Sequence, residues 1–193
     1  MYRSNASIYE NGLLRSGTLT DRNGLVLAKA EDGQHTYAES AAVRKASLHA
    51  VGDFEGYIGT GALSVFAPEL TGYSWWQGTT GEGGVVRLSI DATLQTAARN
   101  AMNGRNGAVV VLNYETGEIL CMVSAPAYDP AVGADESMEG VYLNRCTQGA
   151  YTPGSVFKLV TLAAALEQIP ELAQRRFTCR PTFLESSKQK SKK

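Results

Sequence analysis

The sequence has few of the residues that build metal sites and disulfide frameworks. Among its 193 residues are three cysteines (Cys121, Cys146 and Cys179) and two histidines (His35 and His49). The cysteines are odd in number and widely spaced, which favours neither a disulfide framework nor a zinc site. The histidines have no partner at the spacing of metal ligands, and we interpret them as surface or loop residues. The sequence therefore predicts no metal and no cofactor.

Strong charge and long apolar runs are scarce as well. The net charge is −1, which gives no electrostatic reason to expect a nucleic acid or an anionic membrane as a partner. No run approaches the roughly 18 apolar residues of a membrane span. The first residues, MYRSNASIYENGLL, lack the basic segment and apolar core of a signal peptide. We therefore expect neither an anchor nor a signal peptide in this sequence.

Residues 1–83 are rich in glycine, which predicts a region of loops and short strands. Residues 16–30 predict a hairpin, because Asn23-Gly24 is typical of a type I′ turn between two strands. Residues 38–48 predict a short helix. The run Gly78–Gly84 is typical of a linker, so we expect a domain boundary after residue 83.

Two side-chain pairs in this region have both a functional and a structural interpretation. Asp21 and Arg22, beside the predicted turn, are residue types found in active sites, but a structural ion pair or a solvated corner is the commoner role. Trp75-Trp76 is able to stack on a ligand, yet a pair of core or interface tryptophans is more common. We expect structural roles for both pairs.

From residue 84 onward the apolar pattern becomes regular. Residues 85–90 predict a strand, and Asp91 is a typical N-cap for a helix over 92–103. Gly104 is expected to end that helix. Four residues are expected to form its apolar face: Leu94, Ala98, Ala101 and Met102.

Two further strands, 107–113 and 118–125, are predicted to form a hairpin around the turn YETG. An irregular loop up to Asn144 follows. Strand, helix, hairpin, loop and a second helix together predict an α+β fold, with helices packed on an antiparallel sheet. Residues 181–193 lose this periodicity and become polar and basic, so we expect a disordered tail.

The second helix begins in the stretch Tyr151–Gln168, YTPGSVFKLVTLAAALEQ. After the Pro-Gly turn, apolar residues recur at helical intervals, which predicts a buried helix. Ser155 and Lys158 are three residues apart and so lie on one face of it. A serine beside a lysine is a possible nucleophile with its base. The same four-letter pattern recurs at Ser187 in the polar tail, so the pattern alone is weak evidence.

The order of these elements, and several strings, resemble the penicillin-binding proteins, in particular the class B cell-wall transpeptidases. Four blocks carry the resemblance: SGTLTDRNGLVLA at 16–28, VVRLSIDATLQTAARNAM at 85–102, GAVVVLNYETGEILCMVSAPAYDP at 107–130, and LNR with YTPGSVFK at 143–158. The resemblance implies a β-rich pedestal segment over 1–83, followed over 84–180 by the N-terminal part of a transpeptidase domain. It also implies a place at the extracytoplasmic face of the cell membrane.

The resemblance further implies a serine acyl-transfer enzyme that crosslinks peptidoglycan. Ser155 is expected to attack the D-Ala-D-Ala end of a stem peptide, and β-lactams are expected to trap the same serine. Lys158 serves as its base only when neutral, a form that burial against Phe157 and the N-terminal end of the helix dipole would favour. Proteins of cell-wall elongation or division are further expected partners.

The sequence also departs from the family pattern. The family carries a Ser-x-Asn motif and a Lys-Thr/Ser-Gly motif after the nucleophile, and neither follows Ser155 here. Tyr142-Leu143-Asn144 has the shape of a Tyr-x-Asn variant of the first motif, but it precedes Ser155 and fits the family's Asn-Arg segment better. We therefore expect a truncated chain that is inactive or nearly so by itself.

Two alternatives from other classes stay open. In the first alternative to a transpeptidase, the chain is a non-catalytic interaction module whose pedestal-like part binds cell-wall proteins. In the second, it is a β-lactam sensor or β-lactamase-like protein that shares the Ser-x-x-Lys helix. The hairpin predicted at 16–28 argues against the sensor. Binding by residues 1–84 that is independent of Ser155 would favour the interaction module.

Overall fold

The computed structural model describes residues 9–10, 13–14, 17–31, 34–74, 76, 78–79, 83–135 and 137–178. The chain divides into two compact units, Met1–Ala150 and Tyr151–Lys193. The predictions for Trp75, Cys179 and the tail 181–193, with its second Ser-x-x-Lys match, lie outside the described residues. The boundary expected after residue 83 falls inside the first unit and stays a prediction.

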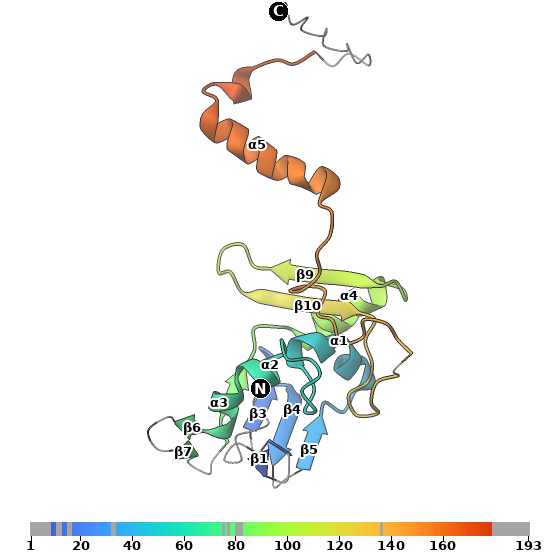
Figure 1. Cartoon of the computed structure of the whole chain (residues 1–193). Helices are drawn as coiled ribbons and strands as arrows, with labels where there is room; N and C mark the ends of the chain where they lie inside the picture. Colours follow the sequence, from blue (N-terminus) through green and yellow to red (C-terminus); the bar gives the residue numbers. More distant parts are fainter. Residues whose placement is uncertain are drawn as a thin grey trace, which may run out of the picture. The chain divides into compact units, whose positions relative to one another are not determined.

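The first sheet of unit 1 grows from the hairpin predicted around Asn23-Gly24 (Figure 1). Its strands, in spatial order, are β5 (Gln34–Tyr37), β4 (Val26–Glu31), β3 (Gly17–Thr20) and β8 (Val85–Arg87). β3 pairs antiparallel with β4, and β4 pairs antiparallel with β5. β8 lies parallel to β3, with Val86 opposite Leu19. The hairpin is confirmed, and the parallel partner completes the sheet.

The turn between β3 and β4 is not the predicted type I′. Gly24 has a φ of +88°, but Asn23 is not among the residues with positive φ, and a type I′ turn needs both. Instead, Oδ1 of the buried Asp21 accepts hydrogen bonds from the backbone N–H groups of Asn23 and Leu25, at 2.8 and 2.9 Å. This side chain fixes the turn locally, as short acidic residues often do, and it confirms a structural role for Asp21.

Three helices and two short ladders complete the N-terminal part of unit 1. They are α1 (Ala41–Val51), α2 (Ala62–Val65), α3 (Ala67–Thr71), and the pairs β1 (Tyr9–Glu10) with β2 (Leu13–Leu14) and β6 (Tyr73–Ser74) with β7 (Gly78–Thr79). Gly17 allows α3 to approach β3 closely, because a Cβ there would lie 2.6 Å from the carbonyl oxygen of Leu70. Leu19, Leu27 and Leu70 belong to the core cluster formed at this contact.

The second sheet consists of β9 (Gly107–Leu112) and β10 (Ile119–Ala125), paired antiparallel with Met122 opposite Val110. Helices α1 and α4 (Ala92–Ala101) pack on β10 and on each other. Figure 1 shows these helices between the two sheets. Helices packed on mainly antiparallel sheets confirm the α+β prediction. Among the described strands, β9 pairs with β10 alone, so its other edge is open.

Helix α4 begins as predicted but buries a different face. Asp91 caps it, accepting from the N–H groups of Thr93 and Leu94 at 2.9 and 3.0 Å. The prediction of an apolar face was wrong in part, because Ala101 is exposed whereas Gln95 is fully buried. A glutamine can occupy this position because both ends of its amide find backbone partners on β10.

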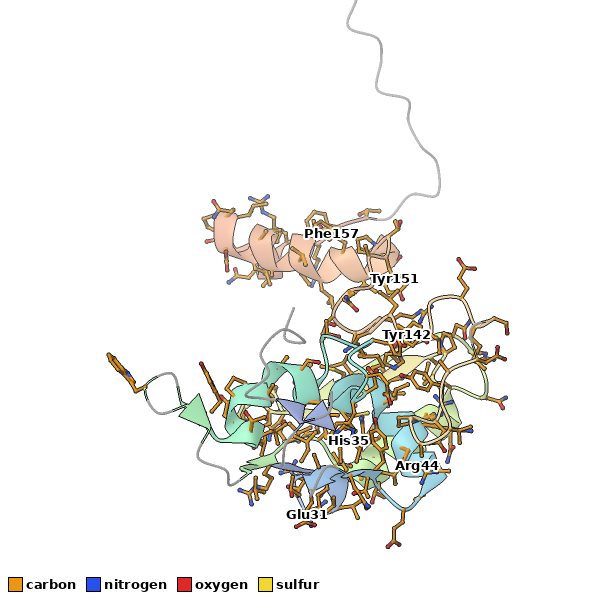
Figure 2. The ribbon with its side chains drawn as sticks, turned by 60° about the horizontal axis from the view of Figure 1, so that its bottom comes forward. Glu31, His35, Arg44, Tyr142, Tyr151 and Phe157 are labelled. Carbon is orange, nitrogen blue, oxygen red and sulfur yellow. The ribbon has the colours of Figure 1, made fainter. Side chains whose placement is uncertain are left out.

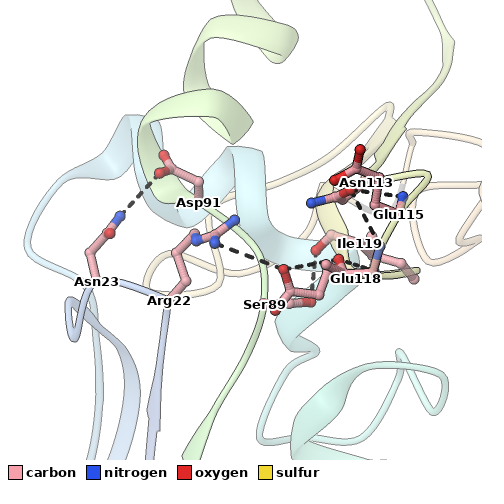
Figure 3. A network of polar contacts seen from close by, with 9 residues as sticks. Arg22, Asn23, Ser89, Asp91, Asn113, Glu115, Glu118 and Ile119 are labelled. Carbon is pink, nitrogen blue, oxygen red and sulfur yellow. Dashed lines mark hydrogen bonds and ion pairs between the residues drawn. The ribbon is translucent and has the colours of Figure 1, made fainter.

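A polar network joins the turns at the ends of the two sheets (Figure 3). Asn23 donates to Asp91 at 3.0 Å, and Ser89 donates to the carbonyl of Ile119 at 2.8 Å. Arg22 and Glu118 form an exposed ion pair at 3.9 Å, which is worth little by itself. The network holds the predicted Asp91 cap against both hairpins.

The expectation of surface or loop histidines was wrong for His49, and the expectation of core or interface tryptophans is tested only for the core. His49 is neither a surface nor a loop residue, because it lies within α1 with 1% of its surface exposed. His35 lies in strand β5 and stacks on Phe54, with ring centroids 3.7 Å apart (Figure 2). Trp76 is 86% exposed and so is not a core residue. The sequence of a helix that contains one histidine among polar residues does not show which of its faces is buried.

Unit 2 contains the 3-10 turn η2 (Gly154–Val156), helix α5 (Phe157–Gln168) and the 3-10 turn η3 (Leu172–Gln174). The predicted helix is confirmed, but the expected burial is not found within unit 2, whose described residues bury none of its side chains. The part of unit 2 that the structure describes, one helix with two short turns, has no second layer to cover an apolar face. Among the helices that the structure describes, none has the length and apolarity needed to cross a membrane.

Candidate functional site

Ser155 lies at the centre of η2, and Lys158 lies in the first turn of α5. Because η2 runs directly into α5, the two residues lie one helical turn apart, as their spacing predicts. The backbone N–H of Val156 donates to the Pro153 carbonyl at 3.2 Å. This bond closes the turn that begins the helix, so the Pro-Gly pair defines where Ser155 lies.

Gly154 adopts a φ of +52° immediately before Ser155. This left-handed conformation is favourable for glycine and unfavourable for most other residues. The turn therefore requires glycine for its backbone, not for a close contact, since nothing lies within 4 Å of an added Cβ. The left-handed conformation of Gly154 thus places Ser155 at the start of the helix.

The helix start offers Ser155 a favourable electrostatic position. The first N–H groups of a helix lack partners within it and carry partial positive charge, which stabilises a developing negative charge nearby. Both Ser155 and Lys158 are exposed, as is every residue from 151 to 160. Within unit 2, then, the described residues do not supply the burial that a neutral lysine depends on.

The segment 126–150, which leads toward Ser155, is anchored in unit 1 by a partly buried ion pair. Nε and Nη2 of Arg44 donate to Oδ1 and Oδ2 of Asp129, each at 2.7 Å (Figure 2 labels Arg44). Nη1 of Arg44 donates to the carbonyls of Ala38 and Glu39. The guanidinium holds the pKa of the Asp129 carboxyl below its usual range. This bidentate ion pair fixes the start of the segment to α1.

A second anchor lies further along the segment, at Asn144. Its Nδ2 donates to the His49 carbonyl at 3.2 Å, and its Oδ1 accepts from the Cys146 N–H at 3.1 Å. Asn144 is 1% exposed, so its amide is occupied inside unit 1. A buried amide with these partners has a structural role, which argues against Tyr142-Leu143-Asn144 as a catalytic motif.

The described cysteines are free thiols unsuited to nucleophilic attack. Burial raises the pKa of Cys121, and burial also raises the pKa of Cys146. A thiol reacts as the thiolate, which a raised pKa disfavours. Among residues 17–178 that the structure describes, no three His, Cys, Asp or Glu side chains are placed to hold a metal ion. Ser155 is therefore the stronger candidate nucleophile.

Three structural residues escaped the sequence analysis: Gln95, Arg44 and His49. Each lies on a helix with an ordinary sequence pattern, and each forms hydrogen bonds with a residue distant in the sequence. Gln95 donates to the Met122 carbonyl at 3.0 Å and accepts from the Met122 N–H at 2.7 Å. The one available signal was a glutamine in place of an apolar residue at the centre of a helix that must pack on a sheet.

Comparison with known families shows what part of the chain is similar to. Residues 107–181 match the family model described as "Penicillin binding protein transpeptidase domain". That match begins at β9 and includes both Ser155 and Lys158. A crystal structure of the D,D-transpeptidase domain of a peptidoglycan glycosyltransferase from Eggerthella lenta is similar, with a TM-score of 0.62 and 33% identity over 79% of this chain and 37% of that one.

Two further relatives are mycobacterial. The peptidoglycan D,D-transpeptidase PbpA of Mycolicibacterium smegmatis is 40% identical over 112 residues, which are 48% of this chain and 23% of PbpA. A structure of penicillin-binding protein A from M. tuberculosis, an acyl-enzyme complex with ceftriaxone, matches with a TM-score of 0.57 and 28% identity, covering 79% of this chain and 41% of that one. The chain is thus similar to class B penicillin-binding proteins, as its sequence blocks predict, and spans about a quarter of the length of PbpA.

Proposed function

We propose that this chain is part of a serine D,D-transpeptidase that crosslinks peptidoglycan stem peptides, with Ser155 as the acylated nucleophile. The observation that carries the proposal is the serine at the N-terminal start of α5, one turn before Lys158, inside the residues that match the transpeptidase family. Relatives named as peptidoglycan D,D-transpeptidases support the same reaction.

In this reaction the Ser155 hydroxyl attacks the carbonyl of the penultimate D-alanine. The peptide bond to the terminal D-alanine breaks, and that residue leaves as a free amino acid after gaining a proton. The stem peptide is then held as an ester on Ser155. An amine from a neighbouring stem attacks the ester, forms the crosslink and returns the proton to the serine oxygen. A β-lactam forms the same ester by opening its ring.

Lys158 is the proposed proton acceptor during the attack by Ser155. A positioned general base contributes roughly 10²–10⁴ to the rate of such a step. A lysine at the start of a helix is destabilised as a cation by the positive end of the helix dipole. Burial by residues outside unit 2 would add to this effect, so we propose that Lys158 acts as a base only where its side chain is covered.

We propose further that the chain alone is inactive or nearly so. The family's Ser-x-Asn and Lys-Thr/Ser-Gly motifs do not follow Ser155 in this sequence. Loss of a single oxyanion donor typically lowers a rate by about 10²–10³. We assign residues 1–83 to a pedestal and place the working protein at the extracytoplasmic face of the cell membrane, with cell-wall elongation or division proteins as candidate partners.

Labelling with a fluorescent penicillin tests both parts of the proposal. Prolonged incubation is expected to give at most a trace of label, at least about 100-fold below an equal amount of a full-length class B relative, because an oxyanion donor is missing. Intact-mass and peptide analysis should place any adduct on Ser155.

Ser155→Ala and Lys158→Met are expected to remove the adduct, whereas Ser187→Ala, in the second Ser-x-x-Lys match, should leave it unchanged. An adduct that persists in Ser155→Ala would contradict the assignment of the nucleophile. Labelling as strong as that of the full-length relative would contradict the proposed inactivity.

A further inference from the structure

The buried imidazole of His49 lies where three elements of unit 1 meet: α1, β10 and the segment 126–150. Its Nε2 is 2.8 Å from the Val141 carbonyl oxygen. A carbonyl only accepts, so Nε2 carries the proton and donates it to this bond. With Nε2 protonated, the neutral ring holds no proton on Nδ1.

The main chain of the same residue holds the next part of the segment. The His49 carbonyl accepts from Nδ2 of Asn144 at 3.2 Å. The Asn144 N–H donates to Oε1 of Gln148 at 3.0 Å, and the Gln148 N–H donates back to the Asn144 carbonyl at 2.8 Å. Residues 141–148 thus contact one position of α1 through both its side chain and its main chain. Ser124 on β10 holds the segment as well, since its hydroxyl donates to the Leu143 carbonyl and accepts from the Arg145 N–H, each at 3.0 Å.

The surroundings of His49 disfavour a positive charge on its ring. Burial lowers the pKa of His49, while the hydrogen bond to Val141 opposes that lowering. Arg145, on the segment, and Arg99, on α4, add to the lowering, whereas the backbone of Ser124 on β10 opposes it. The charged groups that act on this ring from the packed elements are thus both cationic, and no carboxylate among them offsets a protonated imidazole.

We propose that His49 is an acid-sensitive latch that holds residues 141–148 on α1 while its imidazole is neutral and releases them when it is protonated. A proton on Nδ1 would create a third cation beside Arg99 and Arg145 in a buried site. Opening the segment lets water reach the ring and removes this penalty. The inference goes beyond the proposed acyl transfer and does not depend on the chemistry of Ser155.

The direction of the effect follows from linkage. The closed state binds the proton less tightly than the open state, so closure is stable above the pKa of an open histidine, about 6.5, and weakens as the pH falls below it. Hydrogen exchange of peptides that cover 141–148, corrected for the intrinsic exchange rate at each pH, measures this opening. Their protection is expected to fall between about pH 7.5 and about pH 5.5, and the fall approaches tenfold when the closed ring stays neutral throughout that range.

The matched variants are His49→Gln, which keeps a donor for the Val141 carbonyl but does not titrate, and His35→Gln, which removes the other histidine. His49→Gln is expected to make protection independent of pH, and His35→Gln to leave the fall intact. A fall of the same size in His49→Gln, or protection constant within twofold in the wild type, would overturn the proposal. Should His49→Gln not fold, an NMR titration of the wild-type imidazole decides: a ring that titrates at its ordinary pKa while 141–148 stays protected overturns it too.

Discussion

Helices α4 and α5 are of similar length, but they relate to the rest of their units in opposite ways. α4, with the sequence ATLQTAARNA, is half polar, and it has a side-chain cap at Asp91 and buries Ala92 and Gln95. α5, with the sequence FKLVTLAAALEQ, is largely apolar, yet it has no side-chain cap and buries nothing. Apolar composition therefore describes what a helix can bury, while the neighbouring elements decide what it does bury.

The difference has an energetic reason. The buried polar side chain of α4 is Gln95, and its amide bonds both the N–H and the carbonyl of Met122 on β10. In α5 the side chains of Leu159, Leu162 and Leu166 remain half or more exposed. Burying an aliphatic side chain is worth about 1.5–3 kcal/mol, and unit 2 does not realise that gain from its own described residues. Stability should thus be far more sensitive to α4 than to α5.

The largest expected effect comes from Gln95 on α4. Gln95→Met keeps the size of the side chain but leaves the N–H and carbonyl of Met122 without these partners. Since an unsatisfied buried backbone group costs roughly 1–3 kcal/mol, we expect a loss of about 3 kcal/mol in the free energy of unfolding, measured by urea denaturation. Gln168→Met at the end of α5 is the control and should change it by less than about 0.5 kcal/mol. Equal losses in both variants would contradict the expectation that stability depends more on α4 than on α5.

An intermediate effect is expected at the Asp91 cap. Asp91→Ala should cost about 1 kcal/mol, while Asp91→Asn, which keeps an acceptor, should cost less. The Leu94 N–H, and then Asn23, hold the pKa of Asp91 below its usual value. Its contribution is therefore complete above about pH 3.9 and is lost as the pH falls through the lower folded value. Unfolding measured between about pH 2.5 and about pH 6 should show this loss in the wild type and less of it in Asp91→Asn.

The smallest effect is expected on α5 itself. Leu162→Gln together with Leu166→Gln should change the free energy of unfolding of the chain by less than about 0.5 kcal/mol, because both side chains are already exposed. The same pair should reduce self-association, measured by light scattering, since it interrupts an exposed apolar stripe. A loss above about 2 kcal/mol would mean that α5 is buried in solution, and would contradict the contrast between α4 and α5.

Local sequence signals accounted for most of the secondary structure. The hairpin around Asn23-Gly24, the Asp91 cap and the β9–β10 hairpin were all predicted, because each depends on residues close together in the chain. The type I′ turn was wrong for an instructive reason. Asp21 lies just outside the dipeptide that defines the pattern, and its buried carboxylate also accepts a hydrogen bond from the Ala92 N–H at 3.2 Å, some 70 residues away.

For the candidate site, the sequence by itself determined the helical spacing of Ser155 and Lys158, the glycine before them, and the resemblance to the penicillin-binding transpeptidases. Only the tertiary structure decided that Arg44 pairs with Asp129, that His49 and Asn144 hold the segment leading toward Ser155, and that Gln95 is the most buried residue of α4. Periodicity records which residues of one element share a face. It does not record which distant element lies opposite, and buried polar side chains take their roles from that partner.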